Sequence, residues 1–237
     1  ALENLTVIDL TRVLAGPFCT MMLADMGANV IKIEVPKGGD DTRSYPPFRA
    51  KNLNGERESV YFANINRNKK GITLNLKAPE GKEIFKELVK KADIVVENYR
   101  PGVMDKLGLG YDVLKEINPR IIYAAVSGFG CYGPYHLRPG YDILAQAMGG
   151  MMSITGSKGG EPTRAGSALG DILGGLHVTI GILAAVNART ITGKGQRVDV
   201  SLMDSMIAAT ENTALKYIET GNIPAPMGNR YAAVSPY

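Results

Sequence analysis

Short apolar runs in this chain alternate with amphipathic segments, and the spacing of both predicts the secondary structure. Strand-length apolar or alternating patterns lie at residues 5–10, 29–35, 71–76, 94–97, 121–126 and 196–201. Helical patterns lie at residues 17–26, 79–92, 171–189 and 202–220. Strands that alternate with helices predict an α/β fold. We expect a Rossmann-like, open, mostly parallel sheet with helices on both faces.

Polar and glycine-rich segments follow the predicted strands. They occupy residues 11–17, 36–43, 98–102 and 127–141. Because ligands of open parallel sheets bind beyond the carboxyl ends of the strands, we expect these segments to share one rim. The stretch 36–58 lacks apolar periodicity and is rich in proline, glycine and charge, so it predicts a long surface loop.

Asp171 stands out in the run GSALGDILGG, residues 166–175, directly before an apolar helix. The small neighbours leave room for a ligand or for close backbone approach. Aspartate is also common as the first, capping residue of a helix. The local pattern therefore allows two interpretations, a helix cap and a catalytic carboxylate.

Composition narrows the class of protein. The chain is 45% hydrophobic and 21% charged, which is ordinary for a globular protein, and its apolar runs and polar start predict neither a transmembrane helix nor a signal peptide. Cys19 and Cys131 are isolated, and His136 and His177 are the only histidines. These counts predict a reducing compartment, no disulfide framework and no metal site.

A net charge of +4 is only mildly basic, and aromatic residues do not alternate with the basic ones. The sequence thus disfavours nucleic acid as a partner and fits a small polyanion better. The first strand–helix–strand unit and Glu34 are similar to an NAD site, but residues 11–17, TRVLAGP, hold one glycine where that site needs three. Pro17 also removes a backbone N–H that would face the phosphates, which argues against NAD.

Several motifs together resemble the class III coenzyme A transferases, the family of formyl-CoA:oxalate, carnitine and succinyl-CoA-dependent enzymes. In the family's order they are DLTRVLAGP (9–17), GANVIKIE (27–34), GDDTR (39–43), NRNKK (66–70), ENYRPG (97–102), SGFG (127–130), LGD (169–171) and TGKGQ (192–196). The resemblance implies that Asp171 is a nucleophile. CoA would be carried from an acyl-CoA to a carboxylic acid, which we expect to be dicarboxylic, through a covalent aspartyl intermediate.

Two alternatives stay open. The family's fold also serves α-methylacyl-CoA racemases, which carry a histidine where this chain has Tyr141. A tyrosine phenol, with an ordinary pKa of about 10, is a poor base at neutral pH, so Tyr141 favours transfer over racemisation. The other alternative is a non-catalytic CoA-binding module.

The resemblance also implies the residues that contact substrates. For CoA these are Arg12, Val13, Ala15, Leu74, Lys77, Asn98, Tyr99, Lys106 and Leu107. Arg43, Arg138 and Tyr141 are candidates for binding phosphate or substrate, since guanidinium groups recognise such anions with paired hydrogen bonds. No cofactor is expected beyond CoA itself, as substrate and product.

The resemblance further implies the domain organisation. Residues 1–221 would form the Rossmann-like CoA-binding and catalytic large domain, and residues 222–237 a linker towards a small domain absent from this chain. Apolar positions in the last helical pattern, Met203, Met206, Ile207 and Leu215, predict a face that needs partners. We expect an interlocked homodimer without a membrane partner, in the cytoplasm or, in a eukaryote, the mitochondrial matrix.

Overall fold

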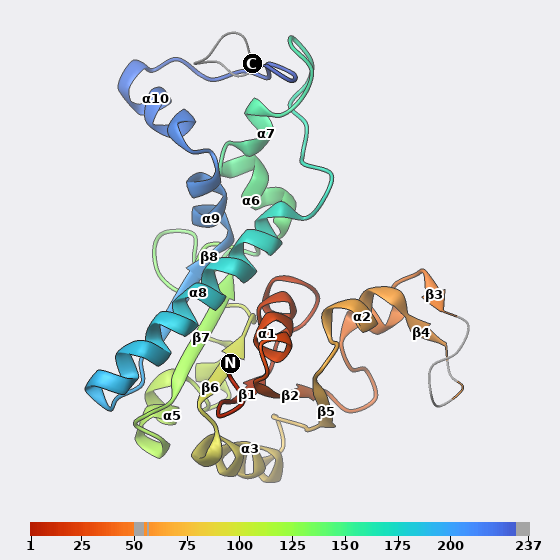
Figure 1. Cartoon of the computed structure of the whole chain (residues 1–237), viewed down its shortest axis with the longest axis vertical. Helices are drawn as coiled ribbons and strands as arrows, with labels where there is room; N and C mark the ends of the chain where they lie inside the picture. Colours follow the sequence, from red (N-terminus) through yellow and green to blue (C-terminus); the bar gives the residue numbers. More distant parts are fainter. Residues whose placement is uncertain (50–54, 56, 231–237) are drawn as a thin grey trace.

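The computed structural model, which describes residues 1–49, 55 and 57–230, is built on a parallel sheet (Figure 1). Six strands pair in the order β5-β2-β1-β6-β7-β8, and every neighbouring pair is parallel. The strands are β1 (Thr6–Asp9), β2 (Asn29–Glu34), β5 (Lys70–Thr73), β6 (Ile94–Glu97), β7 (Ile122–Ser127) and β8 (Arg197–Ser201). The predicted Rossmann-like α/β fold is confirmed.

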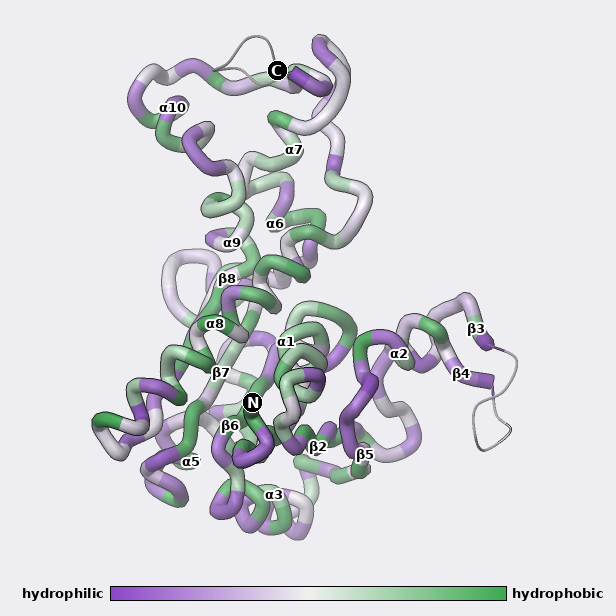
Figure 2. The backbone as a smooth tube through the Cα atoms, viewed as in Figure 1, coloured by the Kyte–Doolittle hydropathy of each residue, from purple (hydrophilic) through white to green (hydrophobic). Residues whose placement is uncertain are grey.

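Helices cover both faces of the sheet, because the central strands carry apolar side chains on each side. Val7 and Val96 pack with α1 (Ala15–Asp25) and α8 (Leu169–Thr192) on one face. Ile8 and Val95 pack on the other face with α3 (Pro79–Lys91), α4 (Val103–Lys106) and α5 (Tyr111–Ile117). Figure 2 shows the apolar colouring concentrated along the strands and along α1 and α8.

Two further groups of elements extend from this body (Figure 1). One is η1 (Asp41–Ser44), the hairpin of β3 (Phe48–Arg49) and β4 (Glu58–Ser59), and α2 (Val60–Ile65). The other is α6 (Asp142–Met148), α7 (Met151–Ile154), α9 (Leu202–Ala209) and α10 (Asn212–Thr220). The prediction of one uninterrupted loop over 36–58 is therefore wrong where η1, β3 and β4 lie; residues 50–54 and 56 fall outside the described residues.

A single helix over residues 202–220 is also a wrong prediction. The chain breaks between α9 and α10, where Glu211 adopts a positive φ of 57°. Met206 is fully buried against α8, whereas Leu215 is 61% exposed, so the apolar positions predicted to share one face divide between core and surface. The predicted linker, 222–237, extends beyond the described residues and stays a prediction.

Helix α8 is the central element of one face. It is long and apolar enough to match a membrane span by length and composition alone. In the structure it packs against α1, β7 and β8, and Val178, Ile182 and Ala185 lie in the core. Its apolar character is thus used to cover the sheet, and its first turn reaches the carboxyl ends of the strands.

Candidate active site

A cavity of about 440 Å³ lies beyond the carboxyl ends of the central strands. The strand order reverses between β1 and β6, which is where open α/β sheets bind ligands. The loops after β1, β6 and β7 meet there with the start of α8, as predicted. The lining residues are Arg12, Val13, Leu14, Ala15, Asp41, Asn98, Tyr99, Arg100, Pro101, Val103, Val126, Ser127, Gly128, Arg138, Pro139, Gly140, Tyr141, Asp171 and Leu202.

Asp171 lies in the first turn of α8 and contributes a carboxylate to the cavity wall. Burial raises the pKa of this carboxyl group to about 7, and the negative charge of Asp142 adds to the rise. The positive end of a helix normally favours an ionised carboxylate, so desolvation and Asp142 outweigh the helix here. A carboxyl group with this pKa exists at neutral pH as both acid and carboxylate.

The interpretation of Asp171 as a helix cap is wrong. The capping position of α8 is Ala168, which makes no side-chain cap. Instead, Asp142 reaches across from α6: its Oδ1 accepts the Gly170 N–H at 2.7 Å, and its Oδ2 accepts from Gln146 at 2.8 Å. Because another carboxylate satisfies the helix N-terminus, Asp171 is left free to face the cavity.

Glycines allow backbone segments to approach closely around the carboxylate. A Cβ at Gly175 would lie 2.7 Å from the Ala15 carbonyl oxygen, so glycine lets α8 cross α1 at this point. A Cβ at Gly128 would lie 2.4 Å from the Gly140 Cα, which brings the two ends of the 128–140 loop together at the cavity wall. The glycine-rich motifs thus shape the site by close packing.

We expect Gly175→Ala to destabilise the protein. The added methyl group meets backbone, and overpacking costs about 1–3 kcal/mol, while the helix propensity of alanine returns at most about 1 kcal/mol. Urea unfolding measures the difference. Gly166→Ala is the matched control, since a Cβ there meets nothing within 4 Å, and equal midpoints for the two variants would contradict the packing argument.

Three guanidinium groups, from Arg12, Arg100 and Arg138, line the cavity. Arg12 pairs with Asp41 at 3.5 Å, with both side chains about half exposed, and Arg138 lies 4.3 Å above the ring of Tyr135. The arginines outnumber the two lining carboxylates, Asp41 and Asp171. The site is therefore suited to an anionic ligand, as phosphate or carboxylate groups would provide.

The structure brings together most of the residues that the sequence singled out. Arg12, Val13, Ala15, Asn98, Tyr99, Arg138 and Tyr141 line the cavity with Asp171. The other four predicted CoA contacts lie outside the cavity wall. Leu74 is buried in the core on the α3 face of the sheet, and Leu107 packs against that core. Lys77 and Lys106 are exposed. Their roles in binding CoA stay predictions.

Asn98 joins the two central loops of the site. Its side-chain amide accepts from the Arg12 N–H at 2.9 Å and donates to the Arg12 carbonyl at 2.7 Å. The loops after β1 and β6 are thereby held at a fixed spacing on either side of the switch point. The Asn98 amide is committed to the loop that carries Arg12 and Val13.

Glu34 ends β2, the position of the ribose-binding acid in an NAD site, but its carboxylate is already bound within the protein. Its carboxylate accepts from Arg43 at 2.6 and 2.8 Å and from the Asp40 N–H at 2.7 Å, and it is 7% exposed. Arg43, a predicted substrate contact, is thereby engaged with Glu34 and also stacks 3.8 Å from the centre of the Phe62 ring. These contacts support the argument from the single glycine against NAD.

Sequence reasoning missed several residues around the carboxylate. Arg100 and Ser127 fall within the predicted rim segments but were not singled out, and Asp142 follows Tyr141 directly. Tyr61 in α2 is also an electrostatic neighbour: burial, and next the charge of Asp171, raise the pKa of its phenol to about 12. The described residues hold no group of three or more His, Cys, Asp or Glu side chains that could bind a metal ion.

Comparison with known proteins identifies the family. Residues 2–237 match the model of CoA-transferase family III. The chain is 48% identical over 236 residues to an acetyl-CoA:oxalate CoA-transferase of Acetobacter aceti, covering 99% of this chain and 59% of that protein. It is 46% identical over 243 residues to a succinyl-CoA:mesaconate CoA-transferase of Haloarcula marismortui, covering 100% of this chain and 60% of that protein.

A solved structure agrees. The crystal structure of a CAIB/BAIF family protein from Brucella suis superposes with a TM-score of 0.92 at 44% identity, over 99% of this chain and 62% of that chain. The chain thus spans less than two thirds of the length of these relatives. The family match over nearly every residue, and the shared fold, lead to one conclusion: the chain belongs to CoA-transferase family III.

Proposed function

We propose that the whole protein transfers coenzyme A from an acyl-CoA thioester to a carboxylic acid through covalent intermediates on Asp171. The observation that carries the proposal is the place of Asp171, a desolvated carboxylate in the wall of an arginine-lined cavity at the switch point. The names of the relatives, which include oxalate, mesaconate and glutarate transferases, support a dicarboxylic acceptor.

The proposed reaction has four balanced steps. The Asp171 carboxylate attacks the thioester carbonyl and the C–S bond breaks. CoA leaves as a thiolate, and an acyl-aspartyl anhydride is formed. The thiolate then attacks the aspartyl carbonyl, which releases the donor acid and leaves an aspartyl-CoA thioester. The acceptor carboxylate attacks this thioester, giving a second anhydride and CoA thiolate. Thiolate attack on the acceptor's carbonyl forms the new acyl-CoA and regenerates Asp171.

The surroundings of Asp171 suit this chemistry. Anhydrides hydrolyse, so the site must limit water, and the close glycine packing around α8 leaves little space behind the carboxylate. The lining arginines would bind the carboxylate of the acceptor or the phosphates of CoA. Tyr141 in the cavity wall supplies no base for the racemase alternative.

The function is tested by assaying the protein at its full natural length. Acyl-CoA donors are incubated with dicarboxylic acids in deuterated water, and both new thioesters and α-carbon deuterium are measured. The proposal requires thioester exchange. Deuterium uptake into a chiral 2-methylacyl-CoA without exchange would show racemisation, and CoA binding without either reaction would show a binding module.

We expect the pH profile of kcat/KM to follow Asp171. The carboxylate is the nucleophile, and its raised pKa leaves it partly protonated below pH 7, so the rate should rise about ten-fold per pH unit up to about pH 7 and then level off. Asp142→Asn keeps an acceptor for the Gly170 N–H but removes a charge, so its profile should move to lower pH. Identical profiles in the two proteins would contradict this electrostatic role.

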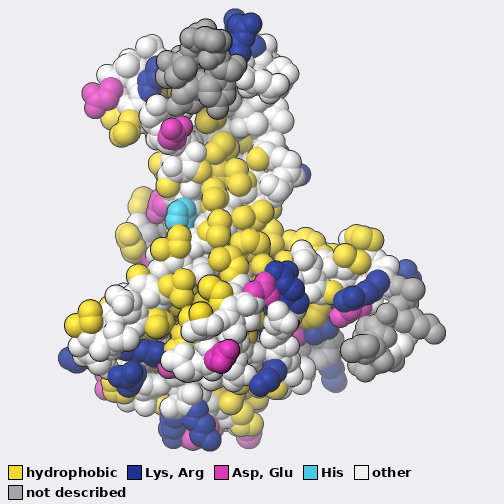
Figure 3. Space-filling view, viewed as in Figure 1, with side chains coloured by type: hydrophobic (Ala, Val, Ile, Leu, Met, Phe, Trp, Pro, Cys, Tyr) yellow, Lys and Arg dark blue, Asp and Glu magenta, His cyan; other side chains and the backbone are white. Residues whose placement is uncertain are grey.

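We also propose that the whole protein is a homodimer. Figure 3 shows apolar side chains gathered over α6, α8 and α9. Exposed apolar residues on these helices and α10 include Ile143, Leu144, Met148, Ile180, Ile207, Leu215 and Ile218. A gathering of exposed apolar side chains such as that over α6, α8 and α9 usually marks an interface. Light scattering tests the proposal, and a fully active monomer at nanomolar concentration would contradict it.

A further inference from the structure

The loop that connects β1 to α1 contains a strained residue in the cavity wall. Val13 has a φ of 66°, in the left-handed region that β-branched residues rarely adopt. It lines the cavity between Arg12 and Ala15. Such a conformation persists only where the surroundings enforce it, and such outliers cluster at ligand sites. The contacts around Val13 must therefore include a group that enforces this conformation.

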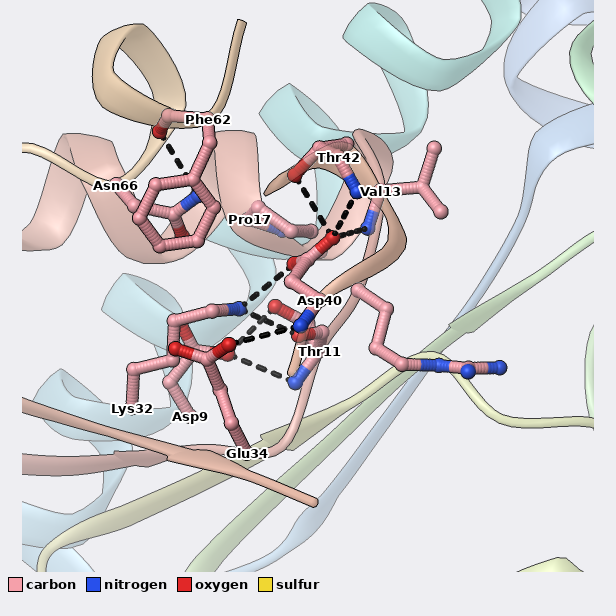
Figure 4. Close-up of polar contacts among 12 residues, drawn as sticks. Asp9, Thr11, Val13, Pro17, Lys32, Glu34, Asp40, Thr42, Phe62 and Asn66 are labelled. Atoms are coloured by element: carbon pink, nitrogen blue, oxygen red, sulfur yellow. Dashed lines mark hydrogen bonds and ion pairs between the residues drawn. The ribbon is translucent and has the colours of Figure 1, made fainter. Parts of the chain in front are cut away.

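Asp40, in the segment after β2, accepts a hydrogen bond from the backbone of Val13. Its Oδ1 accepts the Val13 N–H at 3.2 Å, together with the Thr42 N–H at 3.0 Å and hydroxyl at 2.8 Å. Its Oδ2 lies 3.0 Å from the Lys32 ammonium, and the exposed fractions of Asp40 and Lys32 are 1% and 2%. Figure 4 shows these groups converging beneath the loop.

The loop residues before Val13 are also held by hydrogen bonds. Lys32 donates to the Thr11 carbonyl at 2.7 Å, and the Thr11 N–H is bound by Asp9 at 2.8 Å. The Arg12 peptide is held by Asn98. The Arg12–Val13 peptide is thus held at both ends, its carbonyl by Asn98 and its N–H by Asp40, and the orientation of this peptide relative to α1 sets φ of Val13. Capping η1 requires only the bonds from Asp40 to Thr42. Capping therefore does not explain why Asp40 also binds the Val13 N–H and pairs with the buried Lys32.

We propose that Asp40 is a positioning residue for acyl-CoA binding. By accepting the Val13 N–H it holds the Arg12–Val13 peptide in the orientation that makes Val13 left-handed, and this sets the shape of the part of the cavity wall that Val13 lines. Lys32 acts through Asp40, since its ammonium keeps the buried carboxylate charged while also fixing Thr11. The choice of acyl-CoA as the ligand rests on the proposed function; the conformational statement about Val13 does not.

The test uses the protein at its full natural length. The same pair of substitutions is made once with Val13 present and once together with Val13→Gly. Lys32→Met with Asp40→Leu removes both buried charges together and the acceptor for Val13. We expect KM for acyl-CoA to rise about ten-fold, the loss of one hydrogen bond's worth of binding, with kcat and the KM of the acceptor acid changed by less than about three-fold. Adding Val13→Gly should return KM to within about three-fold of Val13→Gly alone, because glycine adopts positive φ without steric cost.

Two further variants guard against simple misfolding. Val13→Pro leaves the charge pair intact but imposes negative φ and removes the N–H, so it should raise KM like the paired variant. Lys115→Met with Asp112→Asn removes an exposed ion pair on α5 and should leave KM unchanged. An unchanged KM in folded Val13→Pro, or a rise in the paired variant that Val13→Gly does not reverse, would overturn the proposal.

A failed positioning role for Asp40 can be told apart from failure of the proposed function. If the native protein transfers no CoA, the proposed function fails. The positioning role of Asp40 is then tested by crystal structures, which report φ of Val13 without any activity. In the Lys32→Met, Asp40→Leu variant we expect Val13 to return to negative φ. A φ that stays near the native 66° would show that Asp40 does not hold it.

Discussion

Asp171→Ala is expected to lower kcat/KM for CoA transfer by roughly three orders of magnitude or more, the usual cost of losing a covalent nucleophile. The described residues offer no second carboxylate in an equivalent position. Asp41, the other cavity carboxylate, is paired with Arg12. Without a nucleophile, the acceptor acid would have to attack the acyl-CoA directly, and the reaction would lose its division into easier steps.

The loss should come from kcat with little change in acyl-CoA binding, because Asp171 acts on the reacting carbonyl. Unfolding by urea serves to show that the variant keeps the native fold. Asp112→Asn, on the surface of α5, is the matched control and should leave the rate unchanged. Turnover of Asp171→Ala within ten-fold of the native protein would exclude the nucleophile assignment.

Lys69→Met should destabilise the fold by about 3–5 kcal/mol, because it leaves the buried Asp9 carboxylate without its closest cation. Lys69 and Asp9 are 2% and 0% exposed at the side chain and lie 3.0 Å apart. Burial alone would raise the pKa of Asp9, but the charges of Lys69 and Lys32 outweigh it and lower the pKa. The ammonium group also donates to Asn66 and to the Pro17 carbonyl, so three elements meet at it.

Guanidinium chloride unfolding measures this effect, and a second variant separates charge from packing. Lys69→Met with Asp9→Asn removes both charges while keeping an acceptor for the Thr11 N–H, so most of the lost stability should return. Lys115→Met breaks an exposed pair and should leave the unfolding midpoint nearly unchanged. If Lys69→Met lowers the free energy of unfolding equally with and without Asp9→Asn, the unpaired Asp9 charge is not the cause of the destabilisation.

The sheet could be predicted from sequence because its strands are buried on both faces. Val7 and Ile8 are consecutive and both apolar, yet they enter opposite core clusters, which produces the continuous apolar runs that mark central parallel strands. The break at Glu211 carries no such signal. Neither glycine nor proline lies between α9 and α10, and the amphipathic pattern continues across the break.

Asp171 could be singled out from one local motif, and its catalytic role stays a prediction. Asp171 stands between glycines in a motif that the family resemblance covers, and its neighbourhood alone raised the catalytic interpretation. The contacts that define its surroundings are not local. Asp142 reaches Gly170 across 28 residues and Asp40 reaches Val13 across 27, and no periodicity encodes such pairs. Arg43 likewise reads as a free cation until the fold places Glu34 beside it.

The most direct test of the account is to trap the intermediate on Asp171. The protein at its full natural length is mixed with acyl-CoA and hydroxylamine, which attacks activated carboxyl groups, and its peptides are analysed by mass spectrometry. The account predicts a hydroxamate on Asp171 that requires acyl-CoA and is absent from Asp171→Ala. Turnover that proceeds while Asp171 stays unmodified, or a hydroxamate on a different carboxylate, would contradict it.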